Sequence, residues 1–137
     1  MDDLNLDQYQ RHTNMHHLPL MPFAIETFDL RKYDLILSSS HCVAKSVKPR
    51  LGSLHICYCH TPMRYIWDQF DQYFCRVKSG FIPWAIMKML RPWLQQWDSK
   101  TSSRVDDYIA NSRHVQKRIK KYYLKEATII HPPVDTK

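Results

Sequence analysis

The chain has 137 residues, 44% of them apolar and 24% charged, a composition that predicts one globular domain that needs no disulfide or metal to fold. Only two glycines are present, Gly52 and Gly80, so the common glycine-rich phosphate-binding loops are absent. No uncharged stretch is long enough to span a bilayer, and the acidic start Met1-Asp2-Asp3 is unlike a signal peptide. We therefore predict a cytoplasmic protein whose cysteines are reduced.

The charge is divided unevenly along the chain. Residues 1–34 contain six acids and three bases, whereas residues 35–137 contain seven acids and seventeen bases. The net charges of these two parts are −3 and +10, which together give the net charge of +7 of the whole chain. The basic part favours an anionic partner.

Four short apolar runs predict buried β-strands. They cover residues 33–40, 54–59, 107–110 and 126–131. In the second run Cys57 and Cys59 fall on the same face, and the spacing around them is not that of a disulfide framework. Strands that alternate with helical segments predict an α/β fold, with a Rossmann-like parallel sheet and helices on both of its faces.

Three segments between these strands have helical patterns. Thr61-Pro62 predicts a helix start, with a hydroxyl as the cap and a proline in the first turn. Apolar residues recur at helical spacing over residues 81–97, which predicts a long helix with a kink or a restart at Pro92. Asn111-Ser112 precedes a basic helix whose apolar stripe is expected to face inward. That stripe consists of Val115, Ile119 and Tyr122.

The loops after the first two strands carry the candidate site, because ligands of parallel sheets bind at the carboxyl ends of the strands. Their imidazole and cationic side chains are His41, Lys45, His60 and Arg64. His60 is the strongest candidate, since an imidazole at a strand-to-helix turn can exchange a proton with a hydroxyl near neutral pH. His41 is equally compatible with capping or packing, Lys45 is chosen for its charge alone, and His55 is expected to pack inside its strand.

The residues also bear on three other kinds of site. A metal site is not expected, since Cys57 and Cys59 within one strand cannot easily chelate zinc. A basic nucleic-acid-binding domain is favoured by the charge and the aromatic content, but the signature of a known module is missing. The basic helix is either a solvated face or a contact with an anionic membrane. The residues of that contact would be Lys117, Lys120 and Lys121.

A series of motifs occurs in a fixed order along the chain. It comprises Tyr33-Asp-Leu-Ile-Leu-Ser-Ser-Ser-His41, His55-Ile-Cys-Tyr-Cys-His-Thr-Pro-Met-Arg-Tyr65, Trp67-Asp68, Trp97-Asp98, Arg104-Val-Asp106, Ile109-Ala-Asn-Ser112, Arg118-Ile119, Tyr122-Tyr123 and His131-Pro-Pro-Val-Asp135. With this series the chain resembles the amino-terminal, acceptor-side domain of family-four glycosyltransferases of the GT-B fold. Within that family it resembles the mannosyltransferases of surface-polysaccharide assembly.

The resemblance also indicates what surrounds this domain. It runs from about Leu18 to the end of the chain, whereas such domains begin with further strand-helix units and continue into a second domain that binds the nucleotide sugar. We therefore expect a chain truncated at both ends. Residues 1–17 would be a polar lead-in, residues 18–131 a partial glycosyltransferase domain and residues 132–137 the start of an interdomain linker.

The resemblance implies a function and assigns roles to residues. It implies transfer of a hexose such as mannose from a nucleotide sugar to a glycan or lipid-linked acceptor, with retention of configuration. We expect no cofactor. It implies His60 as the residue that orients the sugar or acceptor hydroxyl, with His41 and Arg64 at the acceptor or phosphate. Because the donor-binding domain is missing, the isolated chain is expected to be inactive.

Two alternatives to this function stay open. One is the nucleic-acid-binding domain, although a nucleic-acid partner is not expected, and the other is a non-catalytic remnant of a glycosyltransferase. The expected location is cytoplasmic, with peripheral contact to the inner face of the membrane if the acceptor is lipid-linked.

Overall fold

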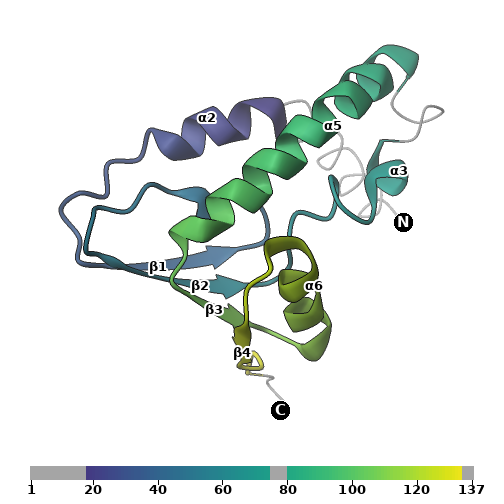
Figure 1. Cartoon of the computed structure of the whole chain (residues 1–137). Helices are drawn as coiled ribbons and strands as arrows, with labels where there is room; N and C mark the ends of the chain where they lie inside the picture. Colours follow the sequence, from purple (N-terminus) through teal and green to yellow (C-terminus); the bar gives the residue numbers. More distant parts are fainter. Residues whose placement is uncertain (1–17, 75–79, 134–137) are drawn as a thin grey trace, which may run out of the picture.

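The computed structural model describes residues 18–74 and 80–133 and shows strands that alternate with helices (Figure 1). In chain order the elements are η1 (Leu18–Leu20), α2 (Met21–Glu26), β1 (Leu35–Ser40), η2 (Ala44–Ser46), β2 (Leu54–Cys59), α3 (Phe70–Tyr73), α5 (Phe81–Thr101), η3 (Ser102–Arg104), β3 (Asp107–Ala110), α6 (Arg113–Tyr123) and β4 (Ala127–Ile129). The elements labelled η are single turns of 3-10 helix.

The strands form one parallel sheet in the order β1-β2-β3-β4. Ser40 pairs with Cys59, Cys59 with Ala110, and Ala110 with Ile129, so the four strands end along one edge of the sheet. The predicted α/β, Rossmann-like fold is therefore confirmed. β2 and β3 have the predicted bounds. β1 begins at Leu35 and not at residue 33, and β4 covers Ala127–Ile129 and not residues 126–131.

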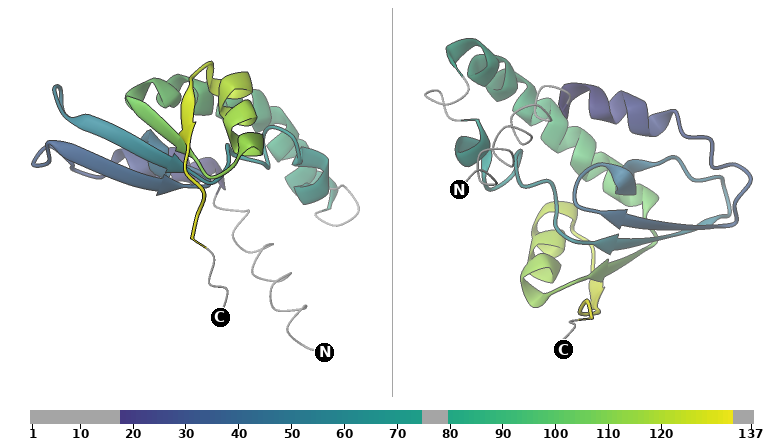
Figure 2. Two further views of the ribbon diagram at one scale, coloured as in Figure 1. Left: turned by 90° about the horizontal axis from the view of Figure 1, so that it is seen from below. Right: turned by 180° about the vertical axis from the view of Figure 1, so that it is seen from behind.

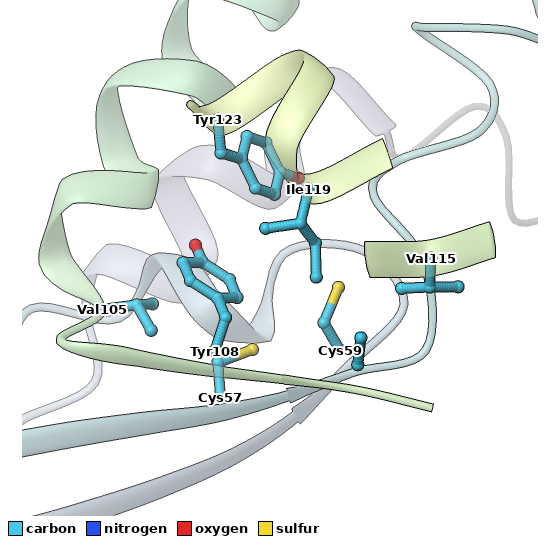
Figure 3. Packing of buried hydrophobic residues seen from close by; sticks show 8 residues of the cluster. Cys57, Cys59, Val105, Tyr108, Val115, Ile119 and Tyr123 are labelled. Carbon is cyan, nitrogen blue, oxygen red and sulfur yellow. The ribbon is translucent and has the colours of Figure 1, made fainter. Parts of the chain in front are cut away.

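One face of the sheet packs against α6 and the end of α5. Cys57, Tyr108 and Ala110 point from this face toward Val115 and Ile119 of α6, and all five residues are buried. Figure 3 shows Cys57 and Tyr108 on the strands below Val115 and Ile119. Full burial of an apolar side chain of this size stabilises a fold by about 1.5–3 kcal/mol, so this cluster holds α6 on the sheet.

The opposite face of the sheet is exposed in the part of the chain that the structure describes. Leu35, Leu37 and Leu54 lie on it, and each is exposed. The prediction placed helices on both faces, whereas α6 packs on the face that carries Cys57 and Tyr108, and the Tyr108 hydroxyl on that face donates to the carbonyl oxygen of Ser102, which directly follows α5. The strands are apolar on both alternating sets of positions, a pattern typical of sheets covered on both sides, and this pattern led to the expectation.

α5 is one continuous helix of 21 residues with Pro92 inside it, so the predicted long helix is confirmed and the restart at Pro92 does not occur. Met87 and Leu94 on its inner side pack in a second cluster, with Met63, Ile66 and Phe70. In the described ranges, none of the helices is both long enough and apolar enough to cross a membrane.

Candidate functional site

The carboxyl edge of the sheet gathers the loops that the sequence singled out. His60 directly follows β2 and Asn111 directly follows β3, level with Ser40 at the end of β1. The His60 amide donates to the Ser40 carbonyl oxygen at 2.8 Å, which extends the parallel ladder by one residue. The expectation that the loops after the first two strands leave from the carboxyl ends of parallel strands is confirmed, and Asn111 lies at the same edge.

The imidazole of His60 is exposed but held between two strands. Its Nε2 lies 2.9 Å from the Oγ of Ser39 in β1. Its ring also makes an edge-to-face contact with Tyr58, with ring centroids 5.2 Å apart, and the Tyr58 hydroxyl donates to the carbonyl oxygen of Ile130 at 3.1 Å. The ring is therefore positioned at the open edge of the sheet before any substrate arrives.

His55, unlike the exposed His60, is buried, as predicted. Its Nδ1 lies 2.9 Å from the carbonyl oxygen of Arg104, and its Nε2 lies 2.9 Å from Ser38 Oγ. Burial lowers the pKa of His55, so the neutral ring is favoured. Because a carbonyl oxygen can only accept, Nδ1 carries the proton and Nε2 accepts from the Ser38 hydroxyl. Both ring nitrogens are therefore used inside the fold.

Lys45 does not lie at the open edge, where the sequence analysis placed it. Its side chain is buried, and its Nζ forms an ion pair with Asp98 of α5 at 2.9 Å. Nζ also donates to the Asp98 carbonyl oxygen at 2.9 Å and to Ser46 Oγ at 3.3 Å. A single turn of 3-10 helix after β1 directs this side chain inward. Lys45 therefore belongs to the core and not to a substrate site.

The loop that follows His60 is not the helix that Thr61-Pro62 predicted. Residues 61–69 form turns, and the first helix after β2 is the short α3. Thr61 Oγ1 donates to the carbonyl oxygen of Pro62 at 3.1 Å and does not accept an amide, so it does not act as a cap. We call residues 61–69 the β2 loop.

Side chains of α5 supply donors to the backbone of the β2 loop. Arg91 Nε donates to the Ile66 carbonyl oxygen at 2.8 Å and Arg91 Nη2 to that of Trp67 at 2.9 Å. Gln95 Nε2 donates to the same Ile66 oxygen at 2.7 Å. Carbonyl groups that lack helical partners are thus satisfied by a neighbouring element.

Side chains of α6 fix the other side of the β2 loop. Arg118 Nη2 pairs with the Asp68 carboxylate at 2.8 Å and reaches the Pro62 carbonyl oxygen at 3.4 Å. The Tyr122 ring stacks on Trp67 with centroids 4.5 Å apart, and its hydroxyl bonds to Asp68. The loop beside His60 is therefore held from two helices.

His41 and Arg64 are exposed, as a ligand-binding role requires. His41 directly follows β1, and Arg64 lies in the β2 loop, where its carbonyl oxygen accepts the Gln69 amide at 2.9 Å. The structure thus brings His60 together with Ser39 and Tyr58, and it leaves His41 and Arg64 as exposed groups in the two loops that leave this edge.

The basic surface of α6 is exposed as predicted. Ser112 caps the helix by accepting the Val115 amide, and Lys117, Lys120 and Lys121 are exposed. Lys120 pairs with Glu126, and the Lys121 ammonium lies 4.9 Å from the centre of the Tyr122 ring. Arg118 faces inward on the same helix, which the sequence analysis did not assign.

The described cysteines and histidines do not form a metal centre. Within residues 18–74 and 80–133, no group of three or more His, Cys, Asp or Glu side chains is close enough to hold an ion. Cys42, Cys57 and Cys59 are buried free thiols. Burial raises the pKa of Cys42 to about 11, so this thiol stays protonated and unreactive near neutral pH.

The residues that support the site were not predicted from the sequence. Ser39 and Tyr58 flank His60 because they alternate onto the same face of the sheet, and that placement follows from strand periodicity once the register is known. Asp98 and Arg118 could have been noticed as single charges at inward positions of amphipathic helices. The sequence does not give their partners, which lie far away in the chain.

The molecule is thus an α/β domain of Rossmann type, with a positioned imidazole at the carboxyl edge of a parallel sheet. The family model of glycosyltransferase family 4 matches residues 8–137, and the chain belongs to this family. No curated protein and no solved structure matches the chain. The match begins at residue 8, whereas the resemblance was expected to start at Leu18.

Proposed function

We propose that this domain forms the acceptor side of a hexosyltransferase. In this role it helps to transfer a hexose such as mannose from a nucleotide sugar to a hydroxyl of a glycan or lipid-linked acceptor, with retention of configuration. Family membership supports a nucleotide-sugar donor and an acceptor in general. The domain would act on the cytoplasmic side, where nucleotide sugars are the donors.

The observation that carries this proposal is the position of His60. Its ring is exposed at the carboxyl edge, where parallel sheets bind ligands, and Ser39 and Tyr58 fix its orientation. An imidazole held in this way can accept a hydrogen bond from a sugar hydroxyl or donate one to it. His41 and Arg64 on the adjoining loops are the proposed contacts for further acceptor hydroxyls or phosphate.

Replacement of His60 tests the proposal. In a polypeptide that contains this domain and turns over a nucleotide sugar, His60→Ala is expected to lower kcat by about a hundredfold or more, because one positioned hydrogen-bonding or proton-transfer group is lost. Ser39→Ala should produce a smaller loss of kcat, and Ser39→Thr should restore it, since a hydroxyl again meets Nε2. Steady-state kinetics on folded protein, checked by circular dichroism, measures both effects.

His55→Ala is the matched control. His55 is buried and both of its ring nitrogens are bonded inside the fold, so its replacement should lower the free energy of unfolding and leave turnover of the folded enzyme nearly unchanged. Near-normal turnover of His60→Ala, together with loss of turnover in folded His55→Ala, would show that the acceptor does not bind at this edge.

A further inference from the structure

The end of β4 brings another imidazole to the carboxyl edge of the sheet. His131 stands two residues after β4 and is exposed. The pairs Cys59–Ala110 and Ala110–Ile129 place the ends of β2, β3 and β4 at one level, so the chain leaves β4 at the edge that carries His60. The right-hand view of Figure 2 shows β4 on the far side of the sheet from β1, with the chain leaving at its end. His131 has no role in the function proposed above.

The backbone on both sides of His131 is restrained. The Ile130 amide donates to the Ala110 carbonyl oxygen of β3 at 3.0 Å, and the Ile130 carbonyl oxygen accepts from the Tyr58 hydroxyl of β2 at 3.1 Å. Pro132 follows directly, and a proline restricts the preceding residue to an extended backbone. The position of His131 is therefore set by the sheet before any ligand arrives.

The ring of His131 is also held, through one of its two nitrogens. Its Nδ1 lies 3.0 Å from the carbonyl oxygen of Asn111, which directly follows β3. Because a carbonyl oxygen can only accept, Nδ1 carries the proton, and Nε2 of the neutral ring then has the lone pair. With the other residues of 18–74 and 80–133 the ring makes no second hydrogen bond. Nε2 can therefore accept a hydrogen bond from a ligand.

His131 resembles His60 in this respect and differs from His55. His55 is buried and has both ring nitrogens bonded inside the fold. His60 and His131 are exposed, and each uses one nitrogen to bond to the protein, His60 to Ser39 and His131 to the Asn111 carbonyl oxygen. A ring that is oriented by one nitrogen and exposed at the other is prepared for a ligand, because little freedom is lost on binding.

The two exposed imidazoles are connected but stand apart. The Tyr58 ring contacts that of His60, and the Tyr58 hydroxyl bonds to the residue before His131. β3 lies between β2 and β4, and neighbouring strands are about 5 Å apart, so the backbones that carry the two imidazoles are separated by about 10 Å. A ligand group at His131 is therefore remote from a hydroxyl that reacts at His60. Such a contact is the same in the ground state and the transition state, so it strengthens binding without changing kcat.

We propose that His131 is a second acceptor-binding residue, whose Nε2 accepts a hydrogen bond from a sugar hydroxyl of a glycan acceptor. This hydroxyl is distinct from the one that His60 orients. A sugar hydroxyl fits Nε2 because it has a proton to donate, whereas a fully ionised phosphate has none. The inference rests on the proposed acceptor site at His60, and it adds that the acceptor extends along the edge of the sheet toward β4.

Nuclear magnetic resonance of the whole 137-residue chain tests the proposal. Two-bond correlations between ring protons and nitrogens should show His131 with its proton on Nδ1. The ligand probes are the methyl glycosides of mannobiose, glucobiose and galactobiose. With the probe that binds, the Cε1–H signals of His60 and His131 should shift with one common dissociation constant, while the signal of the buried His55 should stay in place.

Two amide variants separate binding by His131 from its bond to the backbone. His131→Asn places a donor near the position of Nδ1 and has nothing at that of Nε2, so it should fold normally and bind the probe about fivefold more weakly. His131→Gln places an acceptor near the position of Nε2 and should recover part of the affinity. In a polypeptide that contains this domain and turns over a nucleotide sugar, His131→Asn should raise the acceptor KM by the same factor and leave kcat nearly unchanged.

His114→Asn is the matched control and should bind the probe as the wild type does, since His114 is an exposed histidine in the first turn of α6. A proton on Nε2 of His131, or unchanged affinity of His131→Asn for a probe that shifts His60, would overturn this inference and leave the proposed function intact. A shift of His131 with inorganic phosphate and not with the sugars would assign an anion site instead. If the probes shift neither imidazole, the inference fails, and turnover of His60→Ala decides the proposed function separately.

Discussion

The connections after β2 and β3 start alike and fold differently. In each, a hydroxyl residue stands two positions after the strand: Thr61 after β2 and Ser112 after β3. The Ser112 Oγ accepts the Val115 amide at 3.3 Å, and α6 begins at the next residue. Thr61 instead donates to the neighbouring Pro62, and the β2 loop follows without a helix.

The difference shows that a cap residue alone does not start a helix. After Ser112 the apolar residues recur at helical spacing and bury one side of α6 against the sheet, so packing stabilises the helix. In the β2 loop, Met63, Ile66 and Trp67 are apolar, but long-range donors from α5 bind the backbone carbonyls of Ile66 and Trp67 that a helix would use itself. The loop beside His60 is therefore fixed by tertiary contacts.

Asp98 connects these two regions, and its replacement should have the largest effect. Its carboxylate accepts from Trp67 of the β2 loop at 2.8 Å and from Tyr123 of α6 at 2.9 Å, and it pairs with Lys45. Burial raises the pKa of Tyr123, so its hydroxyl keeps the proton that it donates. Asp98→Asn leaves the buried Lys45 ammonium without a counter-charge and should lower the free energy of unfolding by about 3–5 kcal/mol.

Urea unfolding followed by tryptophan fluorescence measures this loss. Asp107→Asn is the control, since Asp107 is exposed at the start of β3 and its replacement should change stability by less than about 0.5 kcal/mol. If Asp98→Asn costs no more than this control, the ion pair does not hold the two regions together. Lys45→Met combined with Asp98→Leu should recover part of the stability, because no unpaired charge remains in the core.

Arg118 should have the second largest effect, and that effect should be confined to the β2 loop. Arg118→Leu removes the donor to Asp68 and Pro62 and should cost about 1–2 kcal/mol. Hydrogen exchange of the amides of residues 63–68 should accelerate, while exchange in the capped first turn of α6 should stay slow. Arg113→Leu, an exposed change on the same helix, should leave both regions unchanged. Unchanged protection of the loop in Arg118→Leu would mean that α5 alone holds it.

The features that the sequence predicted are those set by neighbouring residues. The strands, α5 and capped α6 follow from short-range periodicity and from Ser112, and the shared edge follows from parallel strands. The burial of Lys45 depends on Asp98, which is 53 residues away, and the course of the β2 loop depends on donors from α5 and α6. Such pairings form only when the whole domain folds. Local patterns therefore predicted an exposed Lys45 and a helix that starts at Thr61.

Replacement of Ser112 and of Thr61 should have the smallest effects on stability, and it tests directly which of the two hydroxyls caps a helix. Ser112→Ala removes an N-cap acceptor and should lower the free energy of unfolding by about 1 kcal/mol, with faster exchange of the Val115 amide. Ser112→Asp should restore both values, since its carboxylate accepts the same amide. Thr61→Ala removes only a bond to the adjacent Pro62 carbonyl and should change stability by less than about 0.5 kcal/mol. Equal losses for the two alanine variants would show that Thr61 also caps a helix in solution. In that case the β2 loop would form helix beside His60, and Arg91 and Gln95 would have to release the Ile66 carbonyl oxygen.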